Sequence, residues 1–520
     1  MAGAALLATA AAATRPAPTG GTLTVGADLE FADPAVGPNL FQYASCLKLV
    51  NYPDRDLRHG GLRLVPEAAT ALPRVSRDGR TYTLRVRRGF RFYPSGKPVT
   101  AADFAWVLYR DLVPVEPRDG DLLFAPEAAA LLTDVVGANA VMAGGPPSAL
   151  HGVRVAGRRL TIRLTRPVTD FAARLASSYM CALPSGTPTP QWGIKPPIPS
   201  AGPYYIASVD NQYRVVLRRN PLYQGPRPHR FETIRGRRFD PAHPGANDVE
   251  LVSPANLAVA LQLRDPKRTR LVAGTRPLLY YVALNWNRPL FHDHPRLARA
   301  VAYALDRVAL VRAHAPSGGV VTDRMLPSPR PGKPLYPLRP NLARARALAA
   351  GRTGDGRVSI VTCDKSDEAA GDVVAANLRA IGLTPTVRHF NCLFAIAYPI
   401  DADVLLTVWV PNAGSLGGFV YDAASYLRDL LAASPFNHGA GPKTNFAVPA
   451  WTARLAAAAR LPTLPARDRA ASHLDRKLMR AYPPLVPYML RTDHVLLSSR
   501  VGCFTYQPVF GPDLAAICPR

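Results

Sequence analysis

Residues 65–104 carry the pattern that decides the fold, and they read VPEAATALPRVSRDGRTYTLRVRRGFRFYPSGKPVTAADF. Apolar and polar residues alternate over 81–87, which predicts a half-buried β-strand entered through the turn Asp78-Gly79. Thr100 and Asp103 then have the spacing of a capping box, and the apolar residues that follow supply one face of a helix. The stretch therefore predicts a protein that contains both strands and helices.

The rest of the chain continues this mixture. A second alternating strand is expected at 160–164, and Pro295 opens an amphipathic helix. The second half then predicts a strand, a helix and a strand, whose two strands should be parallel neighbours, followed by another strand and two helices. These six elements are expected, in order, at 358–363, 366–381, 384–390, 404–410, 451–460 and 466–482. Together they predict an α/β lobe.

Three stretches together resemble the family 5 extracellular solute-binding proteins. The first is the quoted stretch 65–104, and the second is Ala201-Gly202-Pro203-Tyr204-Tyr205 followed by Arg219 to Tyr223. The third runs from Leu284-Asn285 through 296–301 to Ala304-Leu305-Asp306-Arg307, where we interpret Asp306-Arg307 as a polar helix end. Their order and spacing fit the family along almost the whole chain. Members of this family are receptor subunits of ABC importers, including oligopeptide-, dipeptide- and nickel-binding proteins.

The resemblance implies an α/β, two-lobed, periplasmic-binding-protein-like fold of type II, with an extra subdomain in the first lobe. A ligand in the cleft would shift the equilibrium between open and closed arrangements of the lobes. We expect strands to cross between the lobes near 255–280 and 484–495. The expected division is a leader at 1–20, lobe I at 21–265 with its subdomain at about 61–200, lobe II at 266–488, and a return to lobe I at 489–520.

The function implied by the resemblance is capture of a small solute, peptide-like by first preference, and its delivery to a membrane permease with its ATPase. We expect an extracytoplasmic monomer without a cofactor and without a nucleic-acid partner. The first residues form an Ala-rich apolar run with Ala11 and Ala13 at an A-x-A-like site, as in an export signal. No Lys or Arg precedes this run, so it is either a signal whose start lies upstream or an Ala-rich tail.

Two segments resemble parts of the family that line the cleft. The first is the loop 28–34, with Glu30 and Phe31 as candidate ligand-binding residues. In peptide-binding relatives the second segment carries a tryptophan and, shortly after it, an aspartate that pairs with the amino terminus of a peptide. Trp409 matches that tryptophan, for which core packing and ligand stacking are equally expected, but no carboxylate follows until Asp422. The candidates in the second segment are Trp409, Asn412, Tyr421 and Asp422.

The six cysteines show no C-x-x-C pair and no Cys/His spacing typical of zinc. An even number in an exported chain favours disulfides, with buried free thiols as the alternative. Pairing of neighbours joins Cys363 to Cys392 and Cys503 to Cys518, and this leaves Cys46 with Cys181.

The sequence patterns argue against an enzyme, because the chain has no G-x-S-x-G, H-E-x-x-H, P-loop or dinucleotide-binding motif. His292-Asp293-His294 lacks further metal ligands, and Asp293 serves equally well as the N-cap of the helix opened by Pro295. Glu30 and Asp33 could form a pair of catalytic carboxylates, but we interpret them as solvated loop acids. We therefore expect neither a catalytic site nor a metal site.

The net charge of +26 suggests an alternative to solute transport. Such a charge favours anionic partners, so the alternative is a basic cell-envelope or polyanion-binding protein without a transport role. The basic residues are spread along the chain without a block of five like charges, and most are arginines. A general preference for arginine codons explains the same excess without any function.

Overall fold

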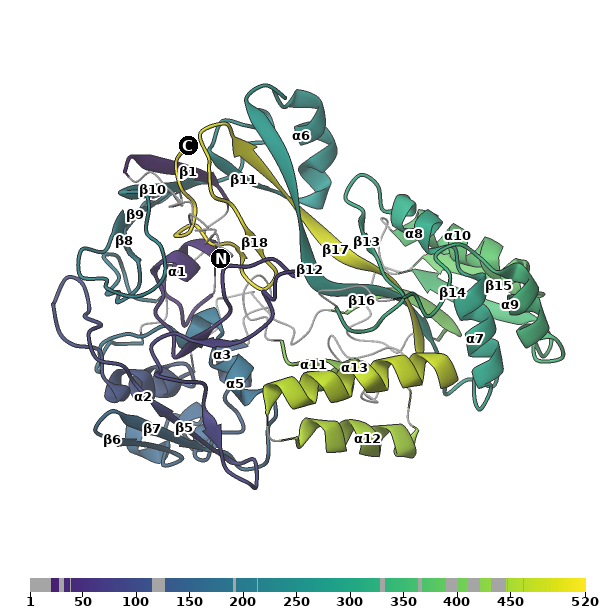
Figure 1. Cartoon of the computed structure of the whole chain (residues 1–520), viewed down its shortest axis with the longest axis horizontal. Coiled ribbons are helices and arrows are strands. Elements are labelled where there is room, and N and C mark those ends of the chain that lie inside the picture. Colours follow the sequence, from purple (N-terminus) through teal and green to yellow (C-terminus); the bar gives the residue numbers. More distant parts are fainter. Residues whose placement is uncertain are drawn as a thin grey trace, which may run out of the picture.

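The structure is a computed structural model with two lobes of mixed α/β composition, which confirms the expected fold class (Figure 1). It describes residues 20–27, 32–37, 39–114, 127–189, 193–212, 214–327, 333–362, 367–389, 401–409, 421–431, 446, 448–461 and 463–520.

One continuous sheet runs through both lobes. At its centre two long strands, β12 (Thr269–Leu284) and β17 (Leu485–Ser498), pair in antiparallel fashion from Thr269 opposite Ser498 to Ala283 opposite Leu485. Figure 1 shows both strands passing diagonally between the two lobes. On the second-lobe side the sheet continues through β16 (Val404–Trp409), β14 (Arg357–Thr362) and β15 (Thr384–His389), and β13 (Gly319–Val321) pairs with β17. On the first-lobe side it continues through β11 (Val249–Val252), β1 (Thr22–Gly26), β10 (Thr233–Arg237), β9 (Val215–Arg219) and β8 (Tyr204–Val209).

The first lobe also contains a separate four-stranded sheet, ordered β4 (Arg74–Val75), β5 (Thr81–Arg85), β7 (Arg159–Arg163) and β6 (Val153–Ala156). Strands β5 and β7 confirm the two expected alternating strands. Gly79 has a φ of 71°, a left-handed conformation that favours glycine in the turn before β5. Helix α2 (Ala101–Arg110) begins with the expected capping box, in which the backbone N–H of Thr100 donates to Asp103 Oδ2 at 2.7 Å.

The remaining elements of the first lobe are short. They are the helices α1 (Leu40–Ser45), α3 (Glu127–Ala130), α4 (Ala138–Met142), α5 (Phe171–Arg174) and α6 (Leu257–Leu263), the 3₁₀ turns Pro147–Ala149, Ser178–Met180 and Pro254–Asn256, and the paired strands β2 (Val50–Asn51) and β3 (Val65–Pro66).

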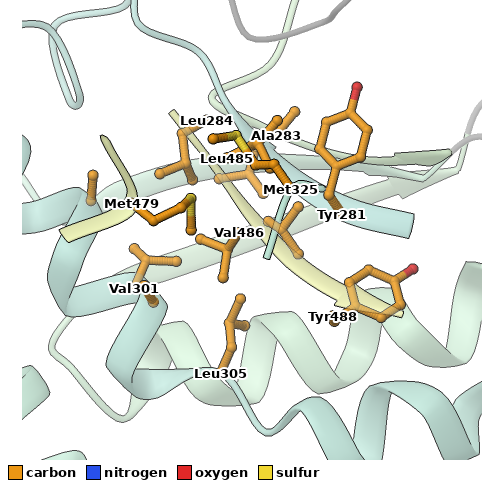
Figure 2. Packing of buried hydrophobic residues seen from close by; sticks show 14 of the residues in the cluster. Tyr281, Ala283, Leu284, Val301, Leu305, Met325, Met479, Leu485, Val486 and Tyr488 are labelled. Carbon is orange, nitrogen blue, oxygen red and sulfur yellow. The ribbon is translucent and has the colours of Figure 1, made fainter. Parts of the chain in front are cut away.

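The second lobe confirms the expected strand–helix–strand unit. Strands β14 and β15 are parallel neighbours joined by α10 (Glu368–Arg379). The other helices are α7 (Pro295–Ala304), α8 (Arg307–Ala313), α9 (Leu342–Ala349), α11 (Ala423–Leu431), α12 (Pro449–Ala459) and α13 (Leu464–Ala481). In Figure 2, Val301 from α7 and Met479 from α13 lie close to Leu485 and Val486 at the start of β17. The long strand is therefore anchored in the core of the second lobe.

After β17 the chain returns to the first lobe through β18 (Tyr506–Gln507) and β19 (Gly511–Pro512). Gln507 Nε2 donates to the backbone oxygen of Gly61 at 2.8 Å, and Arg227 Nη2 donates to Asp513 Oδ1 at 3.0 Å. The numerical limits proposed for the lobes and the subdomain stay a prediction.

Two of the three expected disulfides are present. Cys46 is bonded to Cys181, with 5.1 Å between their Cα atoms, and Cys503 is bonded to Cys518, with 5.0 Å. The third expected pair, Cys363 with Cys392, lies outside the described residues.

Two expectations about helix ends were wrong. His294, not Asp293, is the N-cap of α7, because Asp293 adopts a left-handed φ of 53° one residue earlier. Asp306 does cap α8 by accepting from the N–H of Ala309, but Arg307 is fully buried rather than part of a polar end. Its guanidinium donates to backbone oxygens of Ala302, Pro337 and Pro487. Three carbonyl acceptors therefore replace the water that an exposed arginine would bind.

Candidate functional site

The two lobes touch directly at the start of α11, in addition to the two crossing strands. The hydroxyl of Tyr52, from the first lobe, accepts from the backbone N–H of Tyr421 at 2.9 Å and donates to the backbone oxygen of Tyr421 at 3.1 Å. Tyr52 is only 1% exposed. A single buried hydroxyl therefore satisfies both backbone groups of the residue that leads into α11.

A second set of hydrogen bonds lies next to the first. The hydroxyls of Thr169 and Ser425 are 2.8 Å apart, and Thr169 lies just before α5 while Ser425 lies on α11. Arg467 Nη1, from α13, donates to the backbone oxygen of Thr169 at 2.8 Å. Figure 1 shows α13 extending from the second lobe towards α5 of the first. We call Tyr52, Thr169, Tyr421, Ser425 and Arg467 the interlobe junction.

Asp422 lies next to this junction, with one carboxylate oxygen hydrogen-bonded and the other facing Arg467. Its Oδ1 accepts from the backbone N–H of Ser425 at 2.9 Å, which caps the first turn of α11. Its Oδ2 is buried without a hydrogen-bond partner among the described residues and lies 3.9 Å from Nε of Arg467. Burial raises the pKa of Asp422, and the charge of Arg467 opposes that rise. The free oxygen can accept a hydrogen bond from an N–H group or from an ammonium.

Trp409 lies at the end of β16 and is 5% exposed. Its ring meets the ring of Tyr426 edge to face, with centroids 6.4 Å apart, and the ring of Tyr421 lies tilted against Tyr426 with centroids 5.7 Å apart. The indole Nε1 of Trp409 has no hydrogen-bond acceptor among the described residues. A buried indole N–H usually has a partner, and the described residues do not supply one here.

Asp422 interacts electrostatically with the carboxylates of Asp170 and Asp468 and more strongly with the guanidinium of Arg467. Asp170 accepts from Arg174 Nε at 3.2 Å through Oδ2, while its Oδ1 is buried without a partner in the described part of the chain. Burial and the charge of Asp422 raise the pKa of Asp468 to about 6. The free acceptors therefore favour a ligand group that is cationic or donates hydrogen bonds.

The structure brings together three of the six residues expected to bind ligand. Trp409, Tyr421 and Asp422 surround Tyr426 and the start of α11, whereas Glu30, Phe31 and Asn412 lie outside the described residues. A role in binding remains a prediction for all six.

The interpretation of Asp33 as a solvated loop acid was wrong. Asp33 is 1% exposed and accepts from Arg110 Nη1 at 2.7 Å and from the backbone N–H of Ile194 at 2.7 Å. This buried ion pair fixes the loop against α2, so Asp33 serves the structure rather than a pair of catalytic carboxylates.

Sequence reasoning missed Tyr52, Thr169, Ser425 and Arg467. Tyr52 and Tyr421 are 369 positions apart, and Thr169 and Ser425 are 256 apart, so no local pattern connects them. Only the packing of the two lobes brings these side chains together.

In the described part of the chain, no cluster of three or more His, Cys, Asp and Glu side chains has the arrangement of a metal site. None of the helices that the structure describes combines the length and the apolar character needed to cross a membrane.

Comparison with known sequences gives one family match and one curated relative. The family profile described as bacterial extracellular solute-binding proteins, family 5, middle region, matches residues 63–424. Protein XP55 of Streptomyces lividans is 26% identical over 223 residues, which cover 41% of this chain and 36% of that protein. The match therefore spans about a third of the length of the curated relative.

Solved structures match over nearly the whole chain. The periplasmic murein tripeptide-binding protein MppA, in its unliganded open form, has a TM-score of 0.78 and 19% identity, covering 97% of this chain and 99% of that one. The oligopeptide-binding protein 2 of clavulanic acid biosynthesis has a TM-score of 0.75 and 22% identity, covering 96% of each chain. At these identities, the likeness establishes the fold.

Proposed function

The chain belongs to the bacterial extracellular solute-binding proteins of family 5, and from this we propose that it is the receptor of an ABC importer, holding a peptide-like solute between its two lobes. The solute would then pass to a membrane permease with its ATPase. We place the protein outside the cytoplasm, as a monomer. The family consists of binding proteins, so neither an enzymatic role nor a polyanion-binding role without transport is retained.

The observation that carries the proposal is a pair of buried polar atoms near α11 without a hydrogen-bond partner among the described residues, namely Asp422 Oδ2, which faces Arg467, and Trp409 Nε1. Buried polar groups nearly always have a partner, so an acceptor and a donor that lack one in the described part of the chain favour a ligand that supplies both. A peptide does so, because its amino terminus donates and its carbonyl oxygens accept. Glu30, Phe31 and Asn412 belong to the proposed site on the resemblance alone.

The arrangement of the lobes supports a mechanism by closure. The fold matches the unliganded open form of MppA with a TM-score of 0.78, and β12 and β17 are continuous through both lobes. A ligand that contacts both lobes stabilises only the closed arrangement and shifts the population towards it. The interlobe junction already holds α11 and α13 against the first lobe, and a ligand bound beside it would add contacts to both lobes.

The test is a thermal-shift screen of the purified chain against short peptides, with sugars, nickel chelates and acidic metabolites as competing classes. A ligand at 100 times its dissociation constant should stabilise the protein by about 2.7 kcal/mol. Small-angle scattering of the same complex should show a smaller radius of gyration than the free protein.

Two substitutions test whether Asp422 and Trp409 bind the ligand. Asp422→Asn keeps a capping residue at the start of α11 but removes the charge, so it should weaken peptide binding at least tenfold with little loss of stability. Trp409→Phe should also weaken binding, whereas Trp451→Phe is the matched control, since Trp451 is a similarly buried tryptophan at 7% exposure on α12. Equal effects of both tryptophan substitutions would contradict the assignment. Failure of every peptide, with a response to another class, would contradict the peptide proposal.

A further inference from the structure

The four-stranded sheet of the first lobe has one face buried in the core and one face in solvent. Tyr82, Leu84, Leu160 and Ile162 point into the core and are at most 3% exposed. Their neighbours along each strand point the opposite way, because successive side chains of a strand alternate between faces. The outward positions are Arg74 on β4, Thr81, Thr83 and Arg85 on β5, Arg159, Thr161 and Arg163 on β7, and Arg154 and Ala156 on β6.

The strand register aligns these outward residues in rows across the sheet. One row runs Arg74, Thr83, Thr161, Arg154, since each residue is the direct partner of the next. In the neighbouring row Arg85 lies directly opposite Arg159. On the other side, Thr81 lies opposite Arg163. The outward face therefore carries arginine, threonine and one alanine, and no acidic residue. We call Arg74, Arg85, Arg154, Arg159 and Arg163 the arginine face.

All five arginines of this face are exposed. Within the described chain, none of them has a side-chain ion pair or hydrogen bond. Other arginines of the protein are paired closely with carboxylates, as in Arg110 with Asp33 and Arg227 with Asp513. The arginine face is thus a patch of uncompensated positive charge.

Like charges placed directly opposite each other in adjacent strands destabilise a sheet. The pair Arg85 and Arg159 has this arrangement. The neighbouring Arg158 lies close to the same positive charges. Its pKa is lowered by burial and then by the charges of Arg85 and Arg88. A general excess of arginine accounts for many exposed arginines, but not for five on one sheet face in register with no acidic residue among the outward positions.

We propose that the arginine face docks the receptor on an anionic membrane surface, with guanidinium groups contacting lipid phosphates and the threonine hydroxyls between them. The charges extend in two directions, across four strands and along about five residues, so the patch measures roughly 14 Å by 14 Å. A planar array matches a bilayer surface, whereas a single anionic polymer would need a stripe or a groove. Such docking would hold the receptor near a permease and is separate from solute binding.

The experiment measures co-sedimentation of the full chain with vesicles of phosphatidylcholine alone and of phosphatidylcholine with 30% phosphatidylglycerol, at rising salt concentration. The wild-type protein should bind only the anionic vesicles, and binding should fall as salt rises. Each basic residue near an anionic surface raises the vesicle-binding constant by about fivefold. The triple variant Arg85→Gln, Arg154→Gln, Arg159→Gln should therefore bind about 100-fold more weakly.

The matched control removes the same charge from other exposed sites. Arg296, Arg339 and Arg476 are exposed and have no ion pair within the described residues, so their triple change to Gln should leave vesicle binding within about fivefold. Equal losses in both triple variants would overturn the proposal, because net charge alone would then drive binding. Absence of binding by the wild-type chain would also overturn it. Tighter binding to soluble polyphosphate than to vesicles, abolished by the arginine-face variant, would assign the face to a polymer instead.

Discussion

Lys48 is a buried lysine whose ammonium lies over two aromatic rings. Its side chain is 0% exposed, and Nζ has no hydrogen-bond partner among the described residues. Nζ lies 3.9 Å from the ring centroid of Phe510 and 4.8 Å from that of Tyr43. Burial lowers the pKa of Lys48 to about 7, although the charge of Glu67 raises it in part. We therefore expect Lys48→Met to stabilise the protein at neutral pH.

The magnitude follows from the pKa. A fall from 10.5 to about 7 means that the charged ammonium costs the folded state about 5 kcal/mol. Loss of the cation–π contacts offsets about 1–2 kcal/mol of the gain. The net expectation is a free energy of unfolding about 3 kcal/mol higher than wild type at pH 7. Methionine suits the site because it is similarly long, flexible and uncharged.

The same reasoning fixes the sign of the pH dependence. Between about pH 7 and pH 10.5 the unfolded chain binds a proton at Lys48 that the folded chain does not, so wild-type stability rises with pH. The rise should be about 1 kcal/mol per pH unit, and Lys48→Met should lack it. Below pH 7, Lys48 is protonated in both the folded and the unfolded chain, and the folded state bears the full cost of burying the ammonium.

The assay is urea unfolding followed by circular dichroism at pH 7, 8 and 9. Lys97→Met is the control, since Lys97 is exposed and its replacement should change stability by less than about 0.5 kcal/mol. A Lys48→Met variant less stable than wild type at every pH would refute the reasoning. Attraction to Glu67 would then outweigh the cost of burying the ammonium.

Three further changes test the junction, the C-terminal return and a buried acid. Tyr52→Phe leaves the N–H and C=O of Tyr421 without their partner, and urea unfolding should show a loss of about 2 kcal/mol; no change would mean that water replaces the hydroxyl. The double change of Cys503 and Cys518 to Ser opens a short loop, and calorimetry should show a loss of about 3 kcal/mol, against an unchanged melting temperature if the disulfide adds nothing. Burial raises the pKa of Asp475 to about 7, so stability falls as pH rises from about 4 to 7; Asp475→Asn should flatten that fall in melting curves, and a persistent slope would exclude Asp475 as its source.

The sequence predicted the elements whose signals are local. The alternation around Tyr82 and Leu84, the capping box of Thr100 and Asp103, and the parallel unit of β14 and β15 all depend on neighbouring residues. The family resemblance supplied the arrangement of two lobes, which no local pattern contains.

The junction was beyond prediction because its contacts join distant parts of the chain. Asp422 was expected from the resemblance, but its capping of α11 and its closeness to Arg467 depend on how the helices pack. Arg307 and Asp33 show the opposite error. Both are charged residues expected in polar surroundings, and both are buried because the fold supplies carbonyl or guanidinium partners that the sequence does not reveal.

Because β12 pairs with β17, the second lobe is one continuous segment of the chain whose two ends lie side by side. The chain enters this lobe after β12 and leaves it at β17, and these two points are hydrogen-bonded neighbours, with Ala283 opposite Leu485. A segment whose ends are adjacent can be exchanged or rejoined without disturbing the rest of the fold. Recombination at these two strands can therefore replace the half of the receptor that carries Trp409 and Asp422 while the arginine face is inherited unchanged. Under the two proposals, such an exchange changes the second-lobe part of the solute site and leaves attachment to the membrane surface as it was.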